Sequence, residues 1–424
     1  MIRIELTENE QPIDYPLPAE LGGLLAESGI VTAAPSISPG MWTVAPAGKV
    51  GVARLRDVEV WIRPKIDIAR LVFLIGYARD PKGWRDSPVE LGTADDLVTA
   101  VAYAFARQAE QALRQGVLQG YREREDALPV LRGRIRETAQ LGRRFGMAVP
   151  LEVRYDEFTV DIAENQLLRT ATQVLLTLPR LTAGVRQQLH KVLLRLGDVT
   201  PLVRGRPAPP WAPTRLNGRY HVALRLAEVV LAASSFEQAR GSLLTSGFLF
   251  DMPKVFEDFV CVALRDALAR HGGAVRLQDR EHHLDVAQRV QLRPDLVWWV
   301  AGRPVAVVDA KYKAEKPSGF PEADLYQMLA YCTALGLDRG YLVYARGNEI
   351  PNLHEVRNAG ITVACHAIDL DTEPMQLLAE LDQLARSLVP EHPSMAELPT
   401  DTRHESARHA GERSADVDAT GVLH

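Results

Sequence analysis

Two aspartates and a lysine in the C-terminal half have the types and spacing that metal-assisted hydrolysis of a phosphodiester requires. Asp309 and Lys311 stand two residues apart near the end of a predicted strand over 303–313. Side chains two apart on a strand share one face, so the carboxylate and the ammonium emerge together. Asp295 stands near the start of the preceding predicted strand, 292–300. Such carboxylates hold Mg²⁺ beside a phosphate, and a neighbouring group orients or deprotonates the attacking water.

The connection between the two strands decides whether Asp295 reaches Asp309. A three-residue loop, Ala301–Gly302–Arg303, pairs residue 300 with residue 304 and places Asp295 opposite Asp309. A two-residue loop puts Asp295 out of register, on the wrong face. Because Gly302 favours the longer loop, we predict three residues. The alternative is an exposed hairpin with an incidental Asp–Lys pair.

Two predicted helices flank the hairpin and carry further polar side chains. Glu257 lies at the border of the apolar stripe of the preceding helix and can supply a third carboxylate; a surface acid is the alternative. In the following helix, Gln327 and Tyr331 are four residues apart and face the same way, with Asp324 one turn earlier. This stripe can touch a phosphate or brace Lys311, or it is an ordinary solvated helix face.

The elements around these residues indicate the fold class. From about Phe248 the pattern is helix, strand, strand, helix, strand, which describes an α/β domain. Its first helix has Asp251 as N-cap and Pro253 in the first turn. Upstream the pattern indicates a mixed α+β region followed by helical segments. The expected upstream elements are a hairpin over 49–66 that turns near Asp57, a helix from Thr93 to Gly116, helices over 162–178, 186–196 and 220–233, and a proline-rich connector over 201–213.

Charge and cysteine usage limit the classes of function. The formal net charge is −5, so the chain as a whole is not an electrostatic DNA binder, and any basic patch must be local. Cys261, Cys332 and Cys365 lack zinc spacing and indicate buried free thiols. The N-terminus lacks the residue order of a signal peptide, and no stretch approaches the roughly 20 apolar residues of a membrane span. We expect a soluble, cytoplasmic protein with a disordered tail after Pro390.

Three ordered motifs resemble the PD-(D/E)xK nuclease superfamily in its RecB-like form. They are RPD at 293–295, VVDAK at 307–311 and QMLAY at 327–331. The resemblance implies a Mg²⁺ site formed by Asp295, Asp309 and Glu257. It also implies that the catalytic site is completed by Lys311, Gln327 and Tyr331.

The upstream half narrows the resemblance to the McrC family, the nuclease subunits of type IV, modification-dependent restriction systems. The resemblance covers about residues 45–345 and rests on IRPKI (62–66), GYREREDALPVLRGRI (120–135), YDEFTVDIAENQLLR (155–169) and FDMPKVFEDFV (250–260). It implies an endonuclease that acts on double-stranded DNA containing 5-methylcytosine. It also implies a separately encoded McrB-like AAA+ GTPase hexamer as partner, which recognises the modified base and translocates DNA. In such systems the N-terminal region plugs into the GTPase ring and stimulates hydrolysis.

Four regions follow from the resemblance and the element pattern together. We expect a β-rich N-terminal domain over 1–90 and a mostly helical middle region over 91–240 that contacts the partner. A PD-(D/E)xK nuclease domain over 241–390 and a disordered tail over 391–424 complete the chain. The nucleotide-binding motif GxxxxGK[ST] does not occur in the sequence. Gly48–Lys49 resembles its end, but valine follows in place of serine or threonine. The chain should therefore not hydrolyse nucleotides itself.

An arginine supplied in trans can stimulate hydrolysis by a partner GTPase. The stretches Arg122–Arg124 and Arg132–Arg134 offer candidates, and nothing in the sequence selects one. Solvated loop arginines are the alternative, and for Arg132–Gly133–Arg134 a turn with a close backbone approach. Two other functions stay open: a non-cleaving regulatory adaptor of the GTPase and a stand-alone RecB-like DNA repair nuclease.

Overall fold

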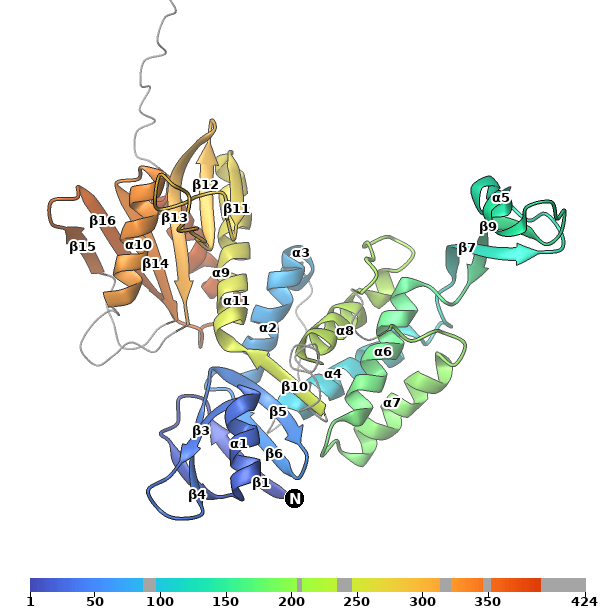
Figure 1. The fold of residues 1–424 in the computed structure, drawn as a ribbon, viewed down its shortest axis with the longest axis horizontal. Helices are drawn as coiled ribbons and strands as arrows, with labels where there is room; N and C mark the ends of the chain where they lie inside the picture. Colours follow the sequence, from blue (N-terminus) through green and yellow to red (C-terminus); the bar gives the residue numbers. More distant parts are fainter. Residues whose placement is uncertain (87–96, 204–207, 235–245, 313–321, 346–351, 390–424) are drawn as a thin grey trace, which may run out of the picture. The chain divides into compact units, whose positions relative to one another are not determined.

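The computed structural model describes residues 1–86, 97–203, 208–234, 246–312, 322–345 and 352–389. Within these ranges the chain forms four β-sheets accompanied by helices (Figure 1). Residues Met1–Leu388 form one compact unit. The predicted domain boundaries at residues 90 and 240 stay predictions. Thr93 and the tail over 391–424 lie outside the described residues.

The N-terminal segment contributes two sheets, with strand orders β1-β6-β5-β10 and β2-β4-β3. Helix α1 (Ala19–Ser28) contacts β3. The predicted hairpin over 49–66 is confirmed, because β5 and β6 pair antiparallel up to Leu55 and Val58. The strands are β1 (Ile2–Thr7), β2 (Ile13–Pro16), β3 (Val31–Pro35), β4 (Met41–Pro46), β5 (Lys49–Leu55), β6 (Val58–Arg63) and β10 (Ser246–Asp251).

Strand β10 and helix α9 (Met252–Leu268) connect this sheet to the C-terminal part of the chain. Strand β10 pairs antiparallel with β5 and ends at Asp251. Asp251 then caps α9, and its carboxylate accepts the N–H of Lys254 at 3.2 Å. Pro253 lies in the first turn, so the predicted start of this helix is confirmed.

The predicted helices of the middle region are confirmed, and they pack on one another. Helix α6 contacts α7 and α8, and α4 also contacts α7 and α8. Gly116, at the predicted end of α4, has a φ of +93°. The helices are α2 (Ile68–Arg79), α3 (Pro81–Asp86), α4 (Leu97–Ala112), α6 (Ala163–Thr177), α7 (Ala183–Arg195), η1 (Gly218–Tyr220) and α8 (His221–Ser234).

A separate three-stranded sheet, of order β7-β9-β8, interrupts this helical region. We call residues 120–159 the arm. Figure 1 shows β7 and β9 as a long antiparallel pair with α5 near its end. The arm consists of β7 (Gly120–Leu128), β8 (Arg134–Ile135), α5 (Glu137–Arg144) and β9 (Leu151–Thr159).

The C-terminal part is a six-stranded mixed sheet of order β11-β12-β13-β14-β16-β15. Strands β11, β12 and β13 pair antiparallel, whereas β13, β14 and β16 pair parallel. The five predicted elements are confirmed, although β12 begins four residues later than predicted. Elements absent from the prediction are β11, β15, β16 and α11. The elements that follow α9 are η4 (Ala269–His271), β11 (Ala274–Leu277), β12 (Leu296–Val300), β13 (Arg303–Lys311), α10 (Glu322–Leu335), β14 (Arg339–Ala345), β15 (Asn352–Val356), β16 (Ile361–Ile368) and α11 (Pro374–Ser387).

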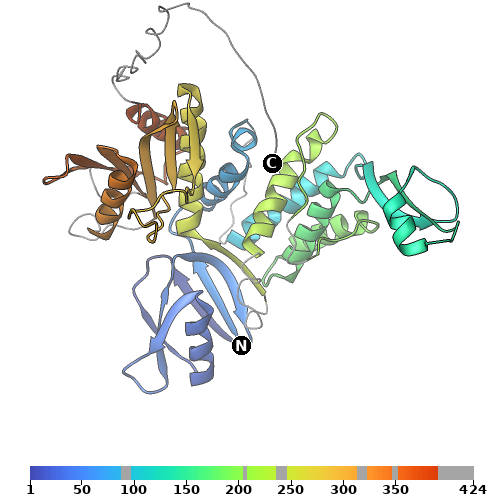
Figure 2. The same cartoon turned by 45° about the horizontal axis from the view of Figure 1, so that its top comes forward.

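Helices α10 and α9 lie on opposite faces of this sheet (Figure 1, Figure 2). Val307 of β13 packs with Met328 and Cys332 of α10 in one buried cluster. Because side chains alternate along a strand, Asp309 and Lys311 lie on the same face as Val307. The sheet therefore presents both groups to α10. The three cysteines are buried and free, as predicted.

Candidate metal centre

The β12–β13 hairpin turns through two residues rather than the predicted three. Ala301 and Gly302 form the turn, and Val300 pairs with Arg303. Both turn residues have positive φ, +49° and +77°. Positive φ at both central residues is what a type I′ turn requires, and its twist matches that of the flanking strands. The predicted three-residue loop is therefore wrong.

A β-bulge at Val305 nevertheless restores the register that the site needs. The pairs around the bulge are Trp299–Pro304, Trp298–Ala306 and Leu296–Val308. One extra residue on one strand shifts the alternation of side chains beyond it. Asp295, which precedes the last of these pairs, thereby lies opposite Asp309. The expected pairing of Asp295 with Asp309 is therefore present, but it results from a two-residue turn and a bulge rather than from a three-residue loop.

Both aspartates are buried at this edge of the sheet: Asp295 is 8% and Asp309 2% exposed. Asp295 Oδ2 accepts the backbone N–H of Ala310 at 2.8 Å. Asp309 Oδ2 forms an ion pair with Lys311 Nζ. That same buried oxygen accepts no hydrogen bond of good geometry from the described residues. Buried carboxylates with incomplete partners favour a cation, because burial penalises an unpaired charge.

The electrostatics of the pair agree with this reading. Burial and then the nearby Asp295 carboxylate raise the pKa of Asp309, against the lowering effect of the Lys311 ammonium, to about 7. Burial also raises the pKa of Asp295, although the N–H of Ala310 opposes the change. Two close carboxylates cannot both ionise readily without a counter-charge. The pair is therefore suited to binding a cation.

Lys311 is held by a chain of hydrogen bonds from α10. Its Nζ donates to Gln327 Oε1 at 3.0 Å. Gln327 Nε2 donates to the Tyr331 hydroxyl at 2.6 Å, and that hydroxyl donates to the Arg293 carbonyl at 3.1 Å. Burial lowers the pKa of Lys311, but the carboxylates of Asp309 and Asp295 outweigh it, so the pKa is raised. The ammonium is thus kept charged and oriented.

The stripe on α10 is not an ordinary solvated face. Tyr331 and Asp324 are both buried, at 3% exposure each. Asp324 accepts a hydrogen bond from the Tyr344 hydroxyl at 3.2 Å, so its carboxylate is directed to the core. Gln327 therefore braces Lys311, and the nearby Asp324 carboxylate also raises the pKa of Lys311.

Glu257 joins the site indirectly, through a residue that the sequence did not indicate. Gln278 Nε2 donates to Glu257 Oε1 and, at 2.9 Å, to Asp295 Oδ1. Burial raises the pKa of Glu257, opposed by the Lys254 ammonium. Gln278 follows β11, which the prediction lacked, and no motif or periodicity marks it. Only the fold brings it between two carboxylates.

The donor set fits a hard divalent cation such as Mg²⁺. The set consists of carboxylate oxygens and contains no thiol or imidazole. Mg²⁺ prefers such oxygen ligands. As the side chains stand, no three His, Cys, Asp or Glu groups in the described ranges form a complete metal cluster. Asp295 and Asp309 are adjacent, while Gln278 separates Glu257 from them. The metal-binding role of Glu257 stays a prediction.

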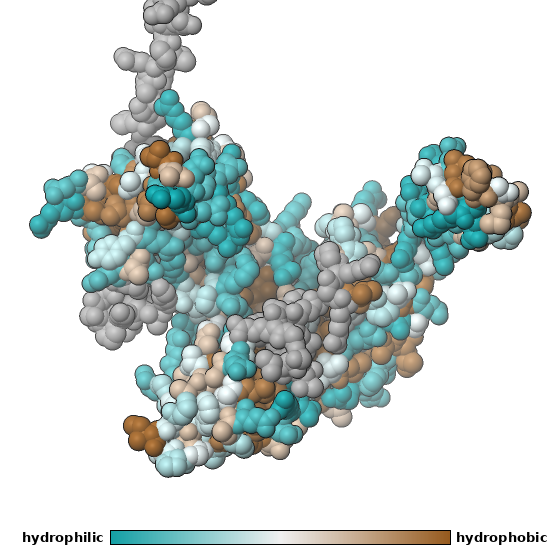
Figure 3. Space-filling view, in the orientation of Figure 1, coloured by the Kyte–Doolittle hydropathy of each residue, from teal (hydrophilic) through white to brown (hydrophobic). Residues whose placement is uncertain are grey.

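The arm has a second notable surface, because large apolar side chains are exposed on it. Figure 3 shows hydrophobic side chains gathered at the end of the arm. Exposed apolar side chains of the arm are Val130 at 66%, Leu131 at 58%, Leu141 at 64%, Phe145 at 85%, Met147 at 52% and Val149 at 53%. Tyr121 at 77% and Phe158 at 57% lie at its other end, where β7 begins and β9 ends. Contiguous exposed apolar surface of this kind marks a binding surface.

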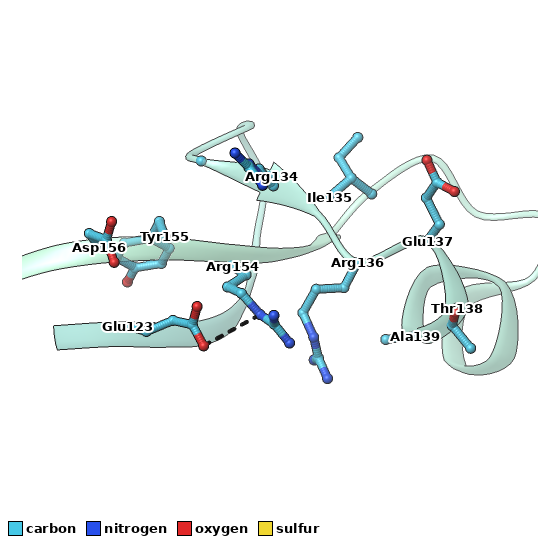
Figure 4. Close-up of a pocket in the computed structure, with 11 residues that line it drawn as sticks. Glu123, Arg134, Ile135, Arg136, Glu137, Thr138, Ala139, Arg154, Tyr155 and Asp156 are labelled. Atoms are coloured by element: carbon cyan, nitrogen blue, oxygen red, sulfur yellow. Dashed lines mark ion pairs between the residues drawn. The ribbon is translucent and has the colours of Figure 1, made fainter.

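Arginines surround a cavity of about 660 Å³ in the arm (Figure 4). Of the arginines that line it, Arg136 and Arg154 each pair with Glu125. Elsewhere on the arm, Arg122 pairs with Asp161 and Arg124 with Glu157. Arg132 stacks on Tyr155, 4.0 Å from its guanidinium carbon to the ring centroid. Arg134 forms no ion pair with the described residues, and Figure 4 shows it apart from the Arg154–Glu123 pair. Arg132 and Arg134 thus both lie outside the ion pairs of the described residues, and Arg132 stacks on Tyr155.

The turn that presents Arg134 depends on Gly133. Its φ is +74°, and a Cβ there would lie 2.2 Å from the Arg154 carbonyl oxygen. The alternative considered for Arg132–Gly133–Arg134, a turn with a close backbone approach, is confirmed.

Comparisons with known proteins agree with this architecture. The family model described as "McrBC 5-methylcytosine restriction system component" matches residues 44–345. A chain of the refined half-complex from the tetradecameric assembly of Thermococcus gammatolerans McrB AAA+ hexamers with bound McrC superposes with a TM-score of 0.55 at 17% identity. That match covers 91% of this chain and 100% of the other, and it shows a shared fold.

A chain of the cryo-EM structure of the Thermococcus gammatolerans McrBC complex matches with a TM-score of 0.36 at 18% identity, over 63% of this chain and 88% of that one. No curated protein matched the sequence. None of the helices in the described ranges has the length and apolar character that a membrane crossing requires.

Proposed function

Since this chain belongs to the family of McrBC 5-methylcytosine restriction system components, we propose that it is the Mg²⁺-dependent DNA endonuclease subunit of such a system. The observation that carries the proposal is the meeting of Asp295, Asp309 and Lys311 at one edge of a mixed sheet. The crossover from β13 through α10 to the parallel strand β14 supports a PD-(D/E)xK nuclease domain.

The chemistry divides between the cation and the protein groups. Mg²⁺ held by Asp295 and Asp309 would offset the charge of the scissile phosphate and lower the pKa of a water molecule. Lys311 is kept protonated by Asp309, so it donates hydrogen bonds to the phosphate or the attacking water rather than accepting a proton. Gln327 and Tyr331 limit the freedom of the ammonium, which serves orientation.

A partner is part of this proposal. The solved structure with the same fold is described as McrB AAA+ hexamers with bound McrC, and we propose a hexameric McrB-like GTPase as the partner here. The arm supports this role, because its exposed aromatic side chains and arginines are the residue types enriched in protein interfaces. Recognition of 5-methylcytosine in double-stranded DNA is assigned to the partner by the family resemblance.

The direct test replaces Asp309 with alanine. Wild-type protein and Asp309→Ala are each mixed with the partner, GTP, Mg²⁺ and methylated DNA, and cleavage and GTP hydrolysis are both measured. We expect loss of cleavage by at least about 100-fold, because removal of a ligand takes away charge stabilisation worth several kcal/mol. GTP hydrolysis should be retained, since Asp309 lies outside the arm.

Asp285→Ala is the matched control, because Asp285 lies in the connection between β11 and β12 and, within the described residues, bonds Arg289 and Val290 of that same connection. It should cleave like wild type. Undiminished cleavage by Asp309→Ala would overturn the proposed site.

A further inference from the structure

Gln278 bridges two carboxylates that come from different elements. Glu257 belongs to α9, whereas Asp295 immediately precedes β12. The amide nitrogen of Gln278 donates to Glu257 Oε1 and to Asp295 Oδ1. A primary amide has two N–H donors, so both are used on carboxylates. The amide oxygen cannot take this place, because it would face two negatively charged acceptors.

The backbone of Gln278 is held for this task. Its N–H donates to the Asp295 carbonyl at 2.9 Å, which ties the residue to β12. Its φ is +51°, in the left-handed region that residues with a Cβ rarely occupy. Conformations of this kind persist where the surroundings over-determine them, and they gather at functional sites. Gln278, which directly follows β11, thus places its amide group between Glu257 and Asp295 in a strained backbone conformation.

We propose that Gln278 is a positioning residue that holds Glu257 and Asp295 in place for the divalent cation. This inference rests on the proposed metal site. Without the bridge, the two carboxylates would repel each other, and the Glu257 side chain would be free to take other rotamers. Carboxylates that bind metals are commonly oriented by hydrogen bonds from neighbouring groups, and loss of such a group lowers metal affinity by about 10- to 100-fold.

The test measures cation binding in the full-length chain, independently of DNA cleavage. Mn²⁺ is the probe, and its affinity is measured by calorimetry while its electron paramagnetic resonance spectrum reports the coordination environment. Gln278→Gly is the main variant, because glycine accepts a positive φ without strain and removes only the side chain. We expect Mn²⁺ affinity about 10-fold weaker than in wild type and an altered spectrum.

Gln288→Ala is the matched control. Gln288 is also a glutamine with a positive φ, +55°, in the same connection between β11 and β12, and it is exposed. Its Mn²⁺ affinity should equal that of wild type. Unchanged or tighter binding by Gln278→Gly would overturn the proposal, since tighter binding would mean that the amide competes with the cation.

Two further variants separate this inference from the proposed function. In Glu257→Gln, the additional loss caused by Gln278→Gly should shrink, because a positioning residue acts through the group that it positions. If the losses of Mn²⁺ affinity caused by Glu257→Gln and Gln278→Gly were additive in the double variant, Gln278 would not act through Glu257. Asp309→Ala tests the metal site itself. If it binds Mn²⁺ like wild type, the proposed site falls; if it loses Mn²⁺ while Gln278→Gly does not, only the positioning role falls.

Discussion

Asp295 and Asp309 form a buried acidic pair at the candidate metal centre, where ionisation of both carboxylates is unfavourable. Asp309 is 2% exposed, and its pKa is raised to about 7, first by burial and then by Asp295. On the proposed function, a divalent cation would compete with a proton for the same oxygen atoms near neutral pH. This competition gives the site a measurable pH dependence.

Mg²⁺ binding should tighten as the pH rises from 6 to 8. The folded-state pKa is raised, so Asp309 is mostly protonated below about pH 7 and must release that proton to the cation. We expect the dissociation constant to fall by up to about 10-fold per pH unit below the pKa and to level off above it. Calorimetry at pH 6, 7 and 8 measures this. Equal affinity at all three pH values would contradict the assignment of the titration to Asp309.

Like Arg132, which stacks on Tyr155, Arg134 forms no ion pair with the described residues of the arm. Its neighbours Arg124 and Arg136 are neutralised by Glu157 and Glu125, each at 2.8 Å. An arginine in an ion pair is less available to stabilise charge on another molecule. Arg134 projects from a turn that only glycine at position 133 allows. The proposed function therefore makes Arg134 the candidate for stimulation in trans.

At the scale of elements, the arm should act on the partner without affecting the metal centre. Arg134→Ala should lower the stimulated GTPase rate of the partner, by about 1,000-fold if the arginine stabilises the transition state directly. Arg124→Ala is the matched control and should change the rate little, since this arginine is held by Glu157. The measurement is the GTP turnover rate of the partner at a saturating concentration of the full-length chain. Mn²⁺ binding should be unchanged in both variants. Equal rates for the two variants would exclude Arg134 as the stimulating group.

The register of the β12–β13 hairpin shows how one irregular residue can place a site. The two-residue turn alone would direct Asp295 away from Asp309, because side chains alternate with a period of two. Val305 adds one residue to β13 and reverses that outcome. The bulge is thus part of the site, although it lies four residues from the nearest carboxylate.

At the scale of the whole molecule, α9 links the N-terminal and C-terminal elements into one unit. It begins where β10 leaves the N-terminal sheet, and it carries Glu257 toward the metal centre. Its Phe259 ring contacts Phe73 and Tyr77 of α2, with centroids 6.0 and 5.6 Å apart. Packing on α2 therefore helps to position an acid that belongs to the C-terminal site.

Loss of that packing should destabilise the protein. Phe259 is fully buried, so Phe259→Ala should lower the free energy of unfolding by about 3–5 kcal/mol. Phe145→Ala is the matched control: this side chain is 85% exposed on the arm, and the change should stay within about 0.5 kcal/mol. Urea denaturation followed by circular dichroism measures both. Similar stability of the two variants would contradict the buried contact.

The amino-acid sequence by itself determined on which elements the candidate site residues stand and which of them share a face. Asp309 and Lys311 share a face because they are two apart on one strand, and Gln327 and Tyr331 share a face because they are four apart on one helix. These relations are local, so spacing alone settles them. The apolar run before Asp309 likewise indicated a buried strand.

Tertiary structure alone decided how these elements meet. The bulge at Val305 depends on pairing between strands, and the place of Gln278 depends on a strand that no clear pattern marked. Glu257 and Asp295 are 38 positions apart in the chain, and only folding brings one amide group within reach of both. Such contacts arise from register and packing across the sheet, which are properties of several segments at once and leave no period in any one of them.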